Sequence, residues 1–330
     1  MIKIAINGFG RIGRTVLKAI MEGEGMQVVA VNDLADAKTL AHLFKYDTVY
    51  GIYPKAVSAT SDTIKVGDQE IKVLSEKDPA RLPWKDMGVD VVIESTGRFT
   101  DKESASLHLT AGAKKVIISA PGKGGVPIYV MSVNDQDYKG EDVISNASCT
   151  TNCIAPITAV IHKEFKIEKS LMSTVHAYTA DQVLQDGPHK DLRRARAAAF
   201  NIVPTTTGAA IAVTEVIPDL KNSFDGISYR VPVPVGSLSD LVYVVAKKTS
   251  IEAVNEALTE ASKKAPLKGI MSVSDEPLVS SDIIGNQYSS IVDLQSTNVI
   301  GGDLVKVVAW YDNEWGYSHR MADMVKLVTK

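Results

Sequence analysis

The first half of the chain alternates short apolar runs with segments of helical periodicity. Five runs are continuously apolar, which is typical of parallel strands covered on both faces: 2–7, 27–33, 90–96, 115–121 and 142–146. Between them, apolar residues recur at helical spacing in 11–22, 36–46 and 101–112. This order predicts the βαβ arrangement of a doubly wound sheet. The alternating segment 55–76 predicts a β excursion at the edge of that sheet.

The pattern changes after about residue 149. Polar and apolar residues now alternate over longer stretches (225–233, 238–250 and 303–313), which predicts an antiparallel sheet. Helical spacing in 149–165, 208–217 and 251–264 places helices on one face of it, and 314–329 forms a closing helix. We therefore expect an α/β domain followed by an α+β domain.

Length and composition agree with a two-domain globular protein. The chain has 330 residues, more than one hydrophobic core usually serves, and is 45% hydrophobic and 23% charged. The net charge of -3 offers no basic field to nucleic acid or an anionic membrane, and no apolar run approaches the ~20 residues of a membrane helix. Two cysteines make no disulfide framework, and no basic-then-apolar leader is present, so we expect a cytoplasmic protein.

A glycine motif follows the first predicted strand. Gly8, Gly10 and Gly13 form G-x-G-x-x-G at the start of a predicted helix, where backbone N–H groups bind a pyrophosphate. Asp33 ends the second predicted strand, 20 residues after Gly13. A carboxylate at this position of the motif binds the adenosine ribose of NAD and repels the 2′-phosphate of NADP. The motif predicts dinucleotide binding, with NAD preferred over NADP.

The two cysteines lie in "SNASCTTNC", at the start of a predicted helix. Ser148 is a candidate N-cap, which places Cys149 in the first turn, where the helix dipole favours a thiolate. Cys153 lies one turn further on and is interpreted as a packed core thiol. The pair lacks further ligands for zinc, and two cysteines at i and i+4 of one helix make a poor disulfide. Cys149 is therefore the candidate nucleophile, and no metal is expected.

A nucleophilic thiol needs a base, and the chain has six histidines. Five are interpreted as surface or packing residues: His42, His108, His162, His189 and His319. His176 differs because it ends the predicted strand 171–179, where a long loop begins. We therefore expect His176 to be the partner of Cys149.

Five motifs in order resemble the phosphorylating, NAD-dependent (type I) glyceraldehyde-3-phosphate dehydrogenase family: "INGFGRIGR", "ASCTTNC", "HAYTADQ", "RRARAAAFNIVPTTTGAA" and "WYDNEWGYSHR". The resemblance covers essentially the whole chain. It implies a Rossmann NAD-binding domain over 1–148, a catalytic α+β domain with a mostly antiparallel sheet over 149–313, and a C-terminal helix, 314–330, that packs back onto the first domain. It also implies a homotetramer.

The resemblance implies oxidation of glyceraldehyde 3-phosphate to 1,3-bisphosphoglycerate with NAD and inorganic phosphate, in glycolysis or gluconeogenesis. Cys149 attacks the aldehyde to give a thiohemiacetal and then a thioester, with His176 as the base. Thr179, Asp181 and Arg230 match the family's substrate-phosphate site. Ser148, Thr150, Arg194, Thr207 and Gly208 match its inorganic-phosphate and substrate contacts.

The same resemblance implies a cofactor site. Its residues are Gly8, Gly10, Arg11, Ile12 and Gly13 at the pyrophosphate, Asp33, Lys77 and Thr96 at the adenosine end, and Ser119, Asn313 and Tyr317 at the nicotinamide. Gly187 replaces a leucine of some strictly NAD-specific members, which leaves dual use of NAD and NADP open. Two other functions stay open: an erythrose-4-phosphate dehydrogenase, against which "TTTGAA" argues, and a non-catalytic NAD- or RNA-binding protein, against which Cys149, His176 and Arg230 argue.

Overall fold

The computed structural model describes residues 1–330, which form two compact units. The first comprises Met1–Tyr129, Asp137–Ala147 and Ser318–Lys330, and the second Val130–Gln136 and Ser148–Tyr317. The segment 130–136 thus groups with the second unit, and the division near the C-terminus falls inside the last helix. None of the helices has the length and apolar character that crossing a membrane requires.

The first unit contains an eight-stranded sheet in the order β10-β9-β8-β1-β2-β7-β6-β5. The five strands expected from the apolar runs are all present, and each pairs in parallel with its neighbours. They are β1 (Ile2–Asn7), β2 (Met26–Asn32), β8 (Val91–Glu94), β9 (Lys115–Ile118) and β10 (Val143–Ser145). The chain runs from β1 to β2 on one side and on to β8 on the other, so the order reverses between β1 and β8, where open α/β sheets bind ligands.

The predicted edge excursion forms β5 (Val57–Ala59), β6 (Thr63–Val66) and β7 (Gln69–Leu74). Only β5 and β6 extend the sheet in antiparallel fashion, because β7 pairs in parallel with β2 and joins the main sheet. A separate ladder joins β3 (Tyr46–Asp47) and β4 (Gly51–Ile52). The alternation in 55–76 therefore predicted strands correctly but not the parallel pairing of the last one.

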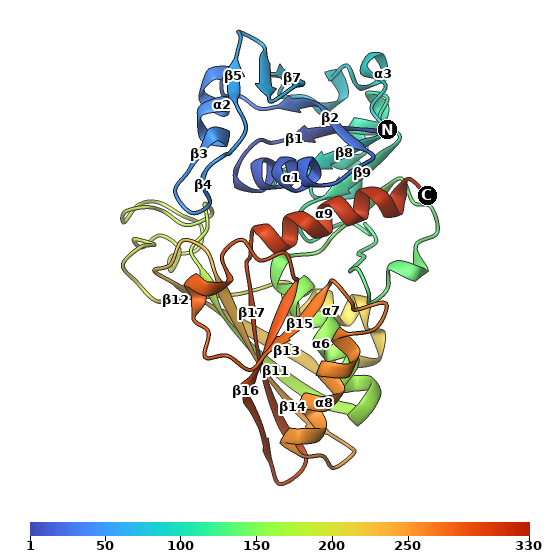
Figure 1. Cartoon of the computed structure of the whole chain (residues 1–330), viewed down its shortest axis with the longest axis vertical. Coiled ribbons are helices and arrows are strands. Elements are labelled where there is room, and N and C mark those ends of the chain that lie inside the picture. Colours follow the sequence, from blue (N-terminus) through green and yellow to red (C-terminus); the bar gives the residue numbers. More distant parts are fainter. The chain divides into compact units, whose positions relative to one another are not determined.

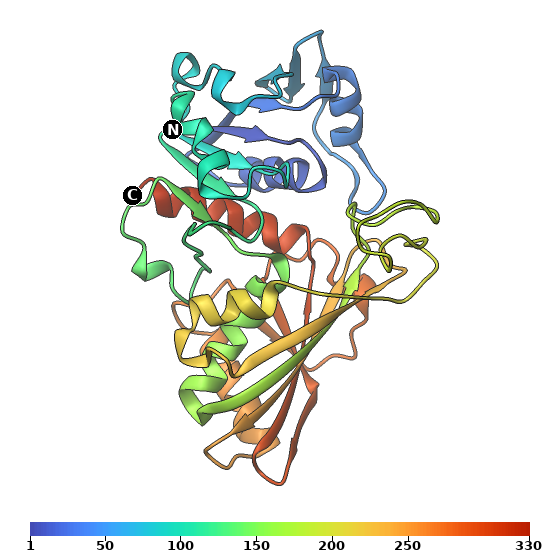
Figure 2. The ribbon, with the colours of Figure 1, turned by 180° about the vertical axis from the view of Figure 1, so that it is seen from behind.

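Helices cover both faces of this sheet. Helix α1 (Arg11–Glu22) lies over one face in Figure 1, and the α4–α5 segment lies on the other side in Figure 2. Helix α2 is Ala37–Lys45. The helix expected over 101–112 is instead two short helices, α4 (Lys102–Ala105) and α5 (Leu107–Thr110). The break falls at Ser106, whose N–H and hydroxyl both donate to Lys102 O.

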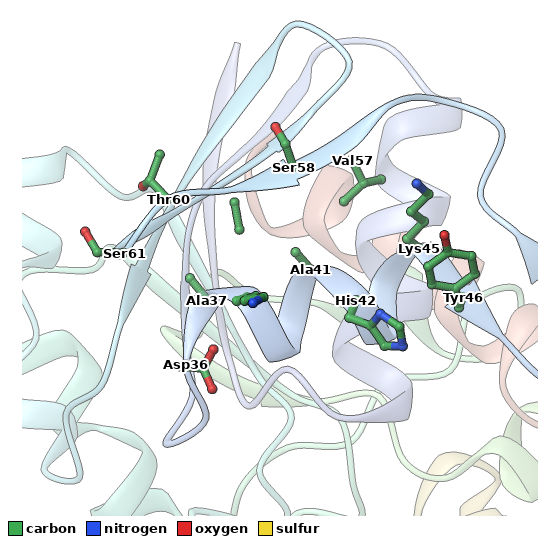
Figure 3. A pocket seen from close by; sticks show the side chains of 12 residues that line it. Asp36, Ala37, Ala41, His42, Lys45, Tyr46, Val57, Ser58, Thr60 and Ser61 are labelled. Atoms are coloured by element: carbon green, nitrogen blue, oxygen red, sulfur yellow. The ribbon is translucent and has the colours of Figure 1, made fainter.

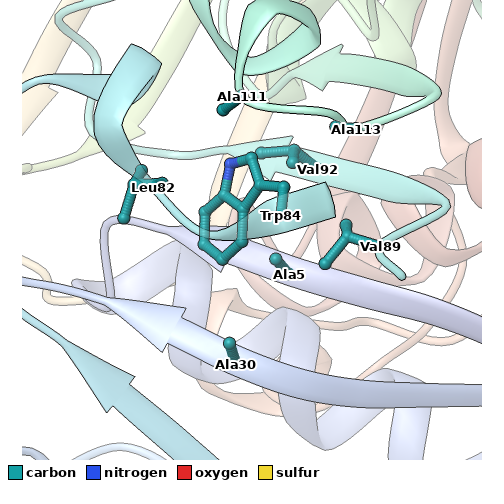
Figure 4. Packing of buried hydrophobic residues seen from close by; sticks show 8 residues of the cluster. All are labelled: Ala5, Ala30, Leu82, Trp84, Val89, Val92, Ala111 and Ala113. Carbon is teal, nitrogen blue, oxygen red and sulfur yellow. The ribbon is translucent and has the colours of Figure 1, made fainter. Parts of the chain in front are cut away.

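A tryptophan is at the centre of one core cluster of the first unit. Trp84, in α3 (Trp84–Met87), is fully buried against Ala5 of β1 and Ala30 of β2, which are paired in the sheet (Figure 4). Two alanines side by side leave the volume that the indole fills. This packing brings the Trp84 N–H to the polar groups described below.

The second unit contains a seven-stranded sheet in the order β12-β13-β11-β14-β17-β16-β15. Its strands are β11 (Ile167–Ala177), β12 (Val203–Thr205), β13 (Phe224–Val231), β14 (Ser237–Val245), β15 (Met271–Ser274), β16 (Ser290–Ile300) and β17 (Leu304–Tyr311). The pairs β11–β13 and β15–β16 are parallel and the others antiparallel, so the predicted fold class is confirmed. The sequence patterns did not predict β12, β15 or β16.

Helices α6 (Cys149–Phe165), α7 (Ala209–Val216) and α8 (Ile251–Ser262) lie on one face of this sheet (Figure 1). Because the helices cover only this face, the side chains of β11 alternate in burial. Met172, Thr174 and His176 are buried, whereas Leu171 and Val175 are exposed on the opposite face. The closing helix α9 (Trp315–Val328) contacts α1 through a hydrogen bond between the Ser318 and Thr15 hydroxyls, both in the first unit.

Candidate active site

Helix α6 begins at Cys149, as its predicted cap requires. The Ser148 hydroxyl accepts a hydrogen bond from the Thr151 N–H at 3.1 Å and caps the helix. The N–H groups of Cys149 and Thr150 therefore lie in the first turn, where the helix itself supplies no acceptor. Cys149 is partly exposed, whereas Cys153 is fully buried, and both thiols are free.

The structure brings Cys149 and His176 together. His176 is the penultimate residue of β11, and its Nε2 lies 3.4 Å from Cys149 Sγ. Its Nδ1 lies 2.7 Å from Ala177 O, and because a carbonyl only accepts, Nδ1 carries a proton. The lone pair of Nε2 in the neutral ring therefore faces the thiol. This is the geometry of a base poised to accept the thiol proton.

The pKa values of the pair differ from the expectation for a helix N-terminus. Burial raises the pKa of Cys149, and the Arg230 charge and the Thr150 hydrogen bonds only partly offset it. Burial, followed by the Arg230 charge, lowers the pKa of His176 to about 4. The backbone N–H groups of the first turn do lower the pKa of Cys149, as expected of a helix N-terminus, but burial outweighs them in the free protein. Proton transfer within the pair creates both charges together, and their attraction at close range opposes these burial penalties.

Tyr311 supports this pair and was not predicted from the sequence. It ends β17, is buried, and its hydroxyl lies 2.9 Å from both Thr150 Oγ1 and Thr174 Oγ1. Its ring meets His176 edge-on, with the ring centroids 5.9 Å apart. Tyr311 therefore links the first turn of α6 to β11. Tyr311 lies in the motif "WYDNEWGYSHR", but its role depends on strand pairing far along the chain, which the motif does not show.

The residues expected at the substrate phosphate form one cluster. Arg230 Nη1 donates to the Thr179 hydroxyl at 2.6 Å and lies 3.9 Å from Asp181 Oδ1. The Thr179 hydroxyl also donates to Asp181. Arg194 joins the same cluster, because its Nη1 lies 3.0 Å from Asp181 Oδ2. Arg230 Nε is buried without a hydrogen-bond partner, so the cluster retains a donor suited to an anion.

Except for Arg194, which lies beside Asp181, the residues expected at the inorganic phosphate occupy the starts of two helices. Gly208 is the N-cap of α7, is exposed, and has open space where a side chain would be. The Thr207 hydroxyl accepts from the Ala209 N–H at 3.1 Å. The Ser148 hydroxyl already bonds to Thr151, and the Thr150 hydroxyl already bonds to Tyr311. The donors that this turn offers to an anion are therefore its backbone N–H groups.

The glycine turn of the first unit fits a dinucleotide. Gly8 has φ +92°, which favours glycine, and a Cβ on Gly13 would lie 2.2 Å from Gly8 O. These two glycines let β1 and α1 approach closely. A Cβ on Gly10, the N-cap of α1, would meet no atom within 4 Å, so the start of the helix is open to a pyrophosphate.

The remaining cofactor candidates divide between the units. Asp33 follows β2 and accepts hydrogen bonds from the Phe9 N–H at 2.8 Å and from the Ala35 N–H at 3.1 Å. Arg11 begins α1 and pairs with Asp47 at 2.7 Å. The others in the first unit are Ile12 in α1, Lys77 after β7, Thr96 after β8 and Ser119 after β9; Asn313 and Tyr317, both buried, belong to the second.

A pocket of about 600 Å³ lies between α2 and β5 in the first unit (Figure 3). His42 and Tyr46 line it with their rings 4.9 Å apart, and Lys45 lies over the Tyr46 ring. It contains none of the residues expected at the cofactor or the substrate. No group of three or more His, Cys, Asp or Glu side chains in residues 1–330 could hold a metal.

Comparison with known proteins identifies the family. The sheet order and the glycine turn of the first unit define a dinucleotide-binding fold, and the second unit is an α+β domain that holds a thiol–imidazole pair. Residues 2–102 match the family model for the NAD binding domain of glyceraldehyde 3-phosphate dehydrogenase, and residues 148–313 match the model for its C-terminal domain. The chain belongs to the glyceraldehyde-3-phosphate dehydrogenase family, as its motifs predicted.

Full-length relatives agree. The chain is 55% identical to the glyceraldehyde-3-phosphate dehydrogenase of Mycolicibacterium smegmatis, covering 100% of this chain and 99% of that protein. It is 54% identical to that of Geobacillus stearothermophilus, covering 99% and 98%. Identity to glyceraldehyde-3-phosphate dehydrogenase 2 of Streptomyces arenae is 53%, with the same coverage. The predictions of family and of NAD as cofactor are therefore confirmed.

Proposed function

We propose that Cys149 and His176 catalyse the oxidation of glyceraldehyde 3-phosphate to 1,3-bisphosphoglycerate, using NAD and inorganic phosphate. Membership of the family supports the NAD-dependent, phosphorylating oxidoreductase activity. The observation that carries the assignment of the two residues is the 3.4 Å approach of His176 Nε2 to Cys149 Sγ, with Nδ1 held by Ala177 O.

The pair accounts for the covalent step. Nε2 of His176 takes the thiol proton as Cys149 Sγ bonds to the aldehyde carbon, giving a thiohemiacetal. The Cys149 N–H donates a hydrogen bond to the developing oxyanion, and the protonated imidazole gives its proton to that oxygen, which forms the thiohemiacetal hydroxyl and leaves the ring neutral. The imidazole then takes the hydroxyl proton as the carbon loses its hydride and becomes a thioester. When bound, NAD supplies the hydride acceptor.

Two groups of residues account for the two phosphates of the reaction. Arg230 and Thr179 hold the phosphate of the substrate, which directs its aldehyde toward Cys149. Arg194, Thr207, Gly208 and the first turn of α6 bind inorganic phosphate. A phosphate oxygen attacks the thioester carbonyl, the C–S bond breaks, and Cys149 leaves as a thiolate. The product carries the new acyl phosphate.

We further propose a cytoplasmic homotetramer. The face of the second sheet opposite its helices exposes apolar side chains, with Leu171 67% exposed and Val175 and Leu304 also exposed. Apolar surface of this kind is typical of a protein interface, and in the proposed tetramer another copy of the chain packs against it. The reactive free thiol suits a reducing compartment.

The substrate assignment is tested by NAD reduction, followed through the absorbance of NADH, with the purified chain. Glyceraldehyde 3-phosphate and erythrose 4-phosphate are compared, each with and without inorganic phosphate, and arsenate replaces phosphate in a parallel series. We expect turnover with the three-carbon sugar that depends on phosphate or arsenate. Turnover independent of added phosphate, or a preference for the four-carbon sugar, would contradict the proposal.

A further inference from the structure

A buried carboxylate in the first unit accepts hydrogen bonds from four donors. Glu94 ends β8 at the reversal of strand order and is 1% exposed. Its Oε1 accepts from the Thr96 N–H at 2.8 Å and from the Thr96 hydroxyl. Its Oε2 accepts from Asn7 Nδ2 at 2.6 Å and lies 3.0 Å from His108 Nε2. No side chain other than a carboxylate could accept from all four.

The hydrogen bonds that reach Glu94 from the core have one direction. Trp84 Nε1 lies 3.0 Å from His108 Nδ1, and an indole N–H only donates, so Nδ1 of His108 is the acceptor. The proton of the imidazole is therefore on Nε2, which donates to Glu94. Trp84 and His108 are both fully buried, so no water can replace either partner. The packing of Trp84 thus orients the second oxygen of Glu94.

The first oxygen of Glu94 holds the turn after β8 against the glycine turn. A Cβ on Gly8 would lie 2.7 Å from Thr96 N, so the two turns are in close contact. The Ser95 hydroxyl joins them by donating to Gly8 O at 2.6 Å. By fixing both the N–H and the hydroxyl of Thr96, Glu94 sets where this turn lies beside Gly8.

The second oxygen connects Glu94 to the other adenosine-end residues through two asparagines. Asn7 Oδ1 accepts from Asn32 Nδ2 at 2.7 Å. Asn32 then binds the backbone of Glu76 twice, at 2.9 Å each, with its Nδ2 donating to the carbonyl and its Oδ1 accepting from the N–H. Asn32 directly precedes Asp33, and Glu76 directly precedes Lys77. One network therefore reaches the neighbours of both predicted cofactor residues.

We propose that Glu94 is a positioning residue that holds the adenosine end of the NAD site in its binding geometry before the cofactor arrives. This inference rests on the proposed function, because it presumes that NAD binds the first unit. Glu94 acts through Thr96, and through Asn7 and Asn32 on Asp33 and the segment at Lys77, without touching the cofactor itself. Preorganisation of this kind lowers the ordering cost of binding.

The decisive variant is Glu94→Gln, which keeps the shape but turns one acceptor oxygen into a donor. The amide cannot accept from all four donors, and the tautomer of His108 cannot change without opposing the Trp84 N–H. We expect Kd for NAD and for ADP-ribose, by calorimetry, to rise by the same factor of about ten. KM for NAD should rise equally, while kcat at saturating NAD and alkylation of Cys149 by iodoacetamide stay unchanged.

Asp90→Asn is the matched control, because Asp90 immediately precedes β8 at its opposite end. Its carboxylate accepts from Lys3 N and Lys114 Nζ, at 2.8 and 2.7 Å, and contacts no predicted cofactor residue. We expect this variant to lose stability but to bind NAD like the wild type. A folded Glu94→Gln variant with wild-type NAD affinity, or an equal loss of affinity in Asp90→Asn, would overturn the inference.

A second pair of variants keeps the test available if Glu94→Gln does not fold. In His108→Gln, the amide can accept from Trp84 and donate to Glu94, whereas His108→Leu can do neither. We expect NAD affinity near the wild type for Gln and several-fold weaker for Leu; equal affinities would overturn the inference. A wild-type chain that binds no NAD would overturn the proposed function as well, whereas unchanged affinity in the variants would overturn this inference alone.

Discussion

Replacement of His176 by asparagine tests the proposed base with little change in local structure. The amide nitrogen of the asparagine would lie near the position of Nδ1 and could still donate to Ala177 O, a bond of 2.7 Å in the wild type. No atom of the new side chain reaches the place of Nε2, which lies 3.4 Å from Cys149 Sγ. The substitution therefore removes the acceptor for the thiol proton and retains the anchor.

The size of the effect follows from the burial of the site. His176 is 4% exposed, so water cannot readily occupy the place of the ring and act as the base. A positioned acid–base group raises the reaction rate roughly 10²–10⁴-fold, and we place the loss of this buried base near the middle of that range. We expect kcat/KM for glyceraldehyde 3-phosphate to fall about 10³-fold, which is about 4 kcal/mol of transition-state stabilisation.

The assay combines turnover with chemical modification. Initial rates of NAD reduction give kcat/KM, and the rate of iodoacetamide alkylation reports the availability of the Cys149 thiolate across pH. Burial raises the pKa of Cys149, and the variant lacks the imidazole that accepts the thiol proton in the wild type, so alkylation in the variant should require a more alkaline pH. NAD affinity serves as the control and should not change. A kcat/KM within about threefold of the wild type would refute the role of His176.

Three further outcomes are expected. Cys149→Ser should abolish turnover and sensitivity to iodoacetate while NAD affinity by calorimetry stays at the wild-type value; residual turnover above the assay background would remove Cys149 from its role. Leu171→Glu should reduce the mass seen by light scattering from four times 35.5 kDa to a smaller assembly, because it charges the exposed sheet face; an unchanged tetramer would place the interface elsewhere. Burial disfavours the charge of Asp90, but Lys114 and the Lys3 N–H outweigh it and lower its pKa, so Asp90→Asn should cost about 0.5–1 kcal/mol of the free energy of unfolding at pH 7. That difference should disappear as the pH falls below about 4, where the unfolded carboxyl and then the folded one take up protons; a cost that persists at acidic pH would contradict the ion-pair account.

Local patterns predicted the elements whose signals lie within the elements themselves. Strand β1 and helix α1 begin and end where expected, because apolar runs and helical spacing are read over a few neighbouring residues. The same patterns missed β16 and gave one helix for α4 and α5. The parallel pairing of β7 with β2 depends on a partner far along the chain, and periodicity carries no information about it.

The sequence by itself determined which reactive and anion-binding groups this protein contains. The N-cap at Ser148, the thiol in the first turn of α6 and the glycine turn after β1 are each local, because short-range hydrogen bonds and backbone sterics produce them. The family motifs added the candidate partners of Cys149 and of the cofactor. What these residues do to one another could not be inferred from their spacing.

Only the tertiary structure decided the protonation and the support of the site. Burial reversed the expected shift of the Cys149 pKa, since desolvation depends on everything packed around the thiol. Strand pairing placed Tyr311 between Thr150 and Thr174, and the fold placed Glu94 where donors from Asn7 and His108 join the two donors of the nearby Thr96. Such convergence arises when distant parts of the chain share one sheet edge, which is why no reading of neighbouring residues could reveal it.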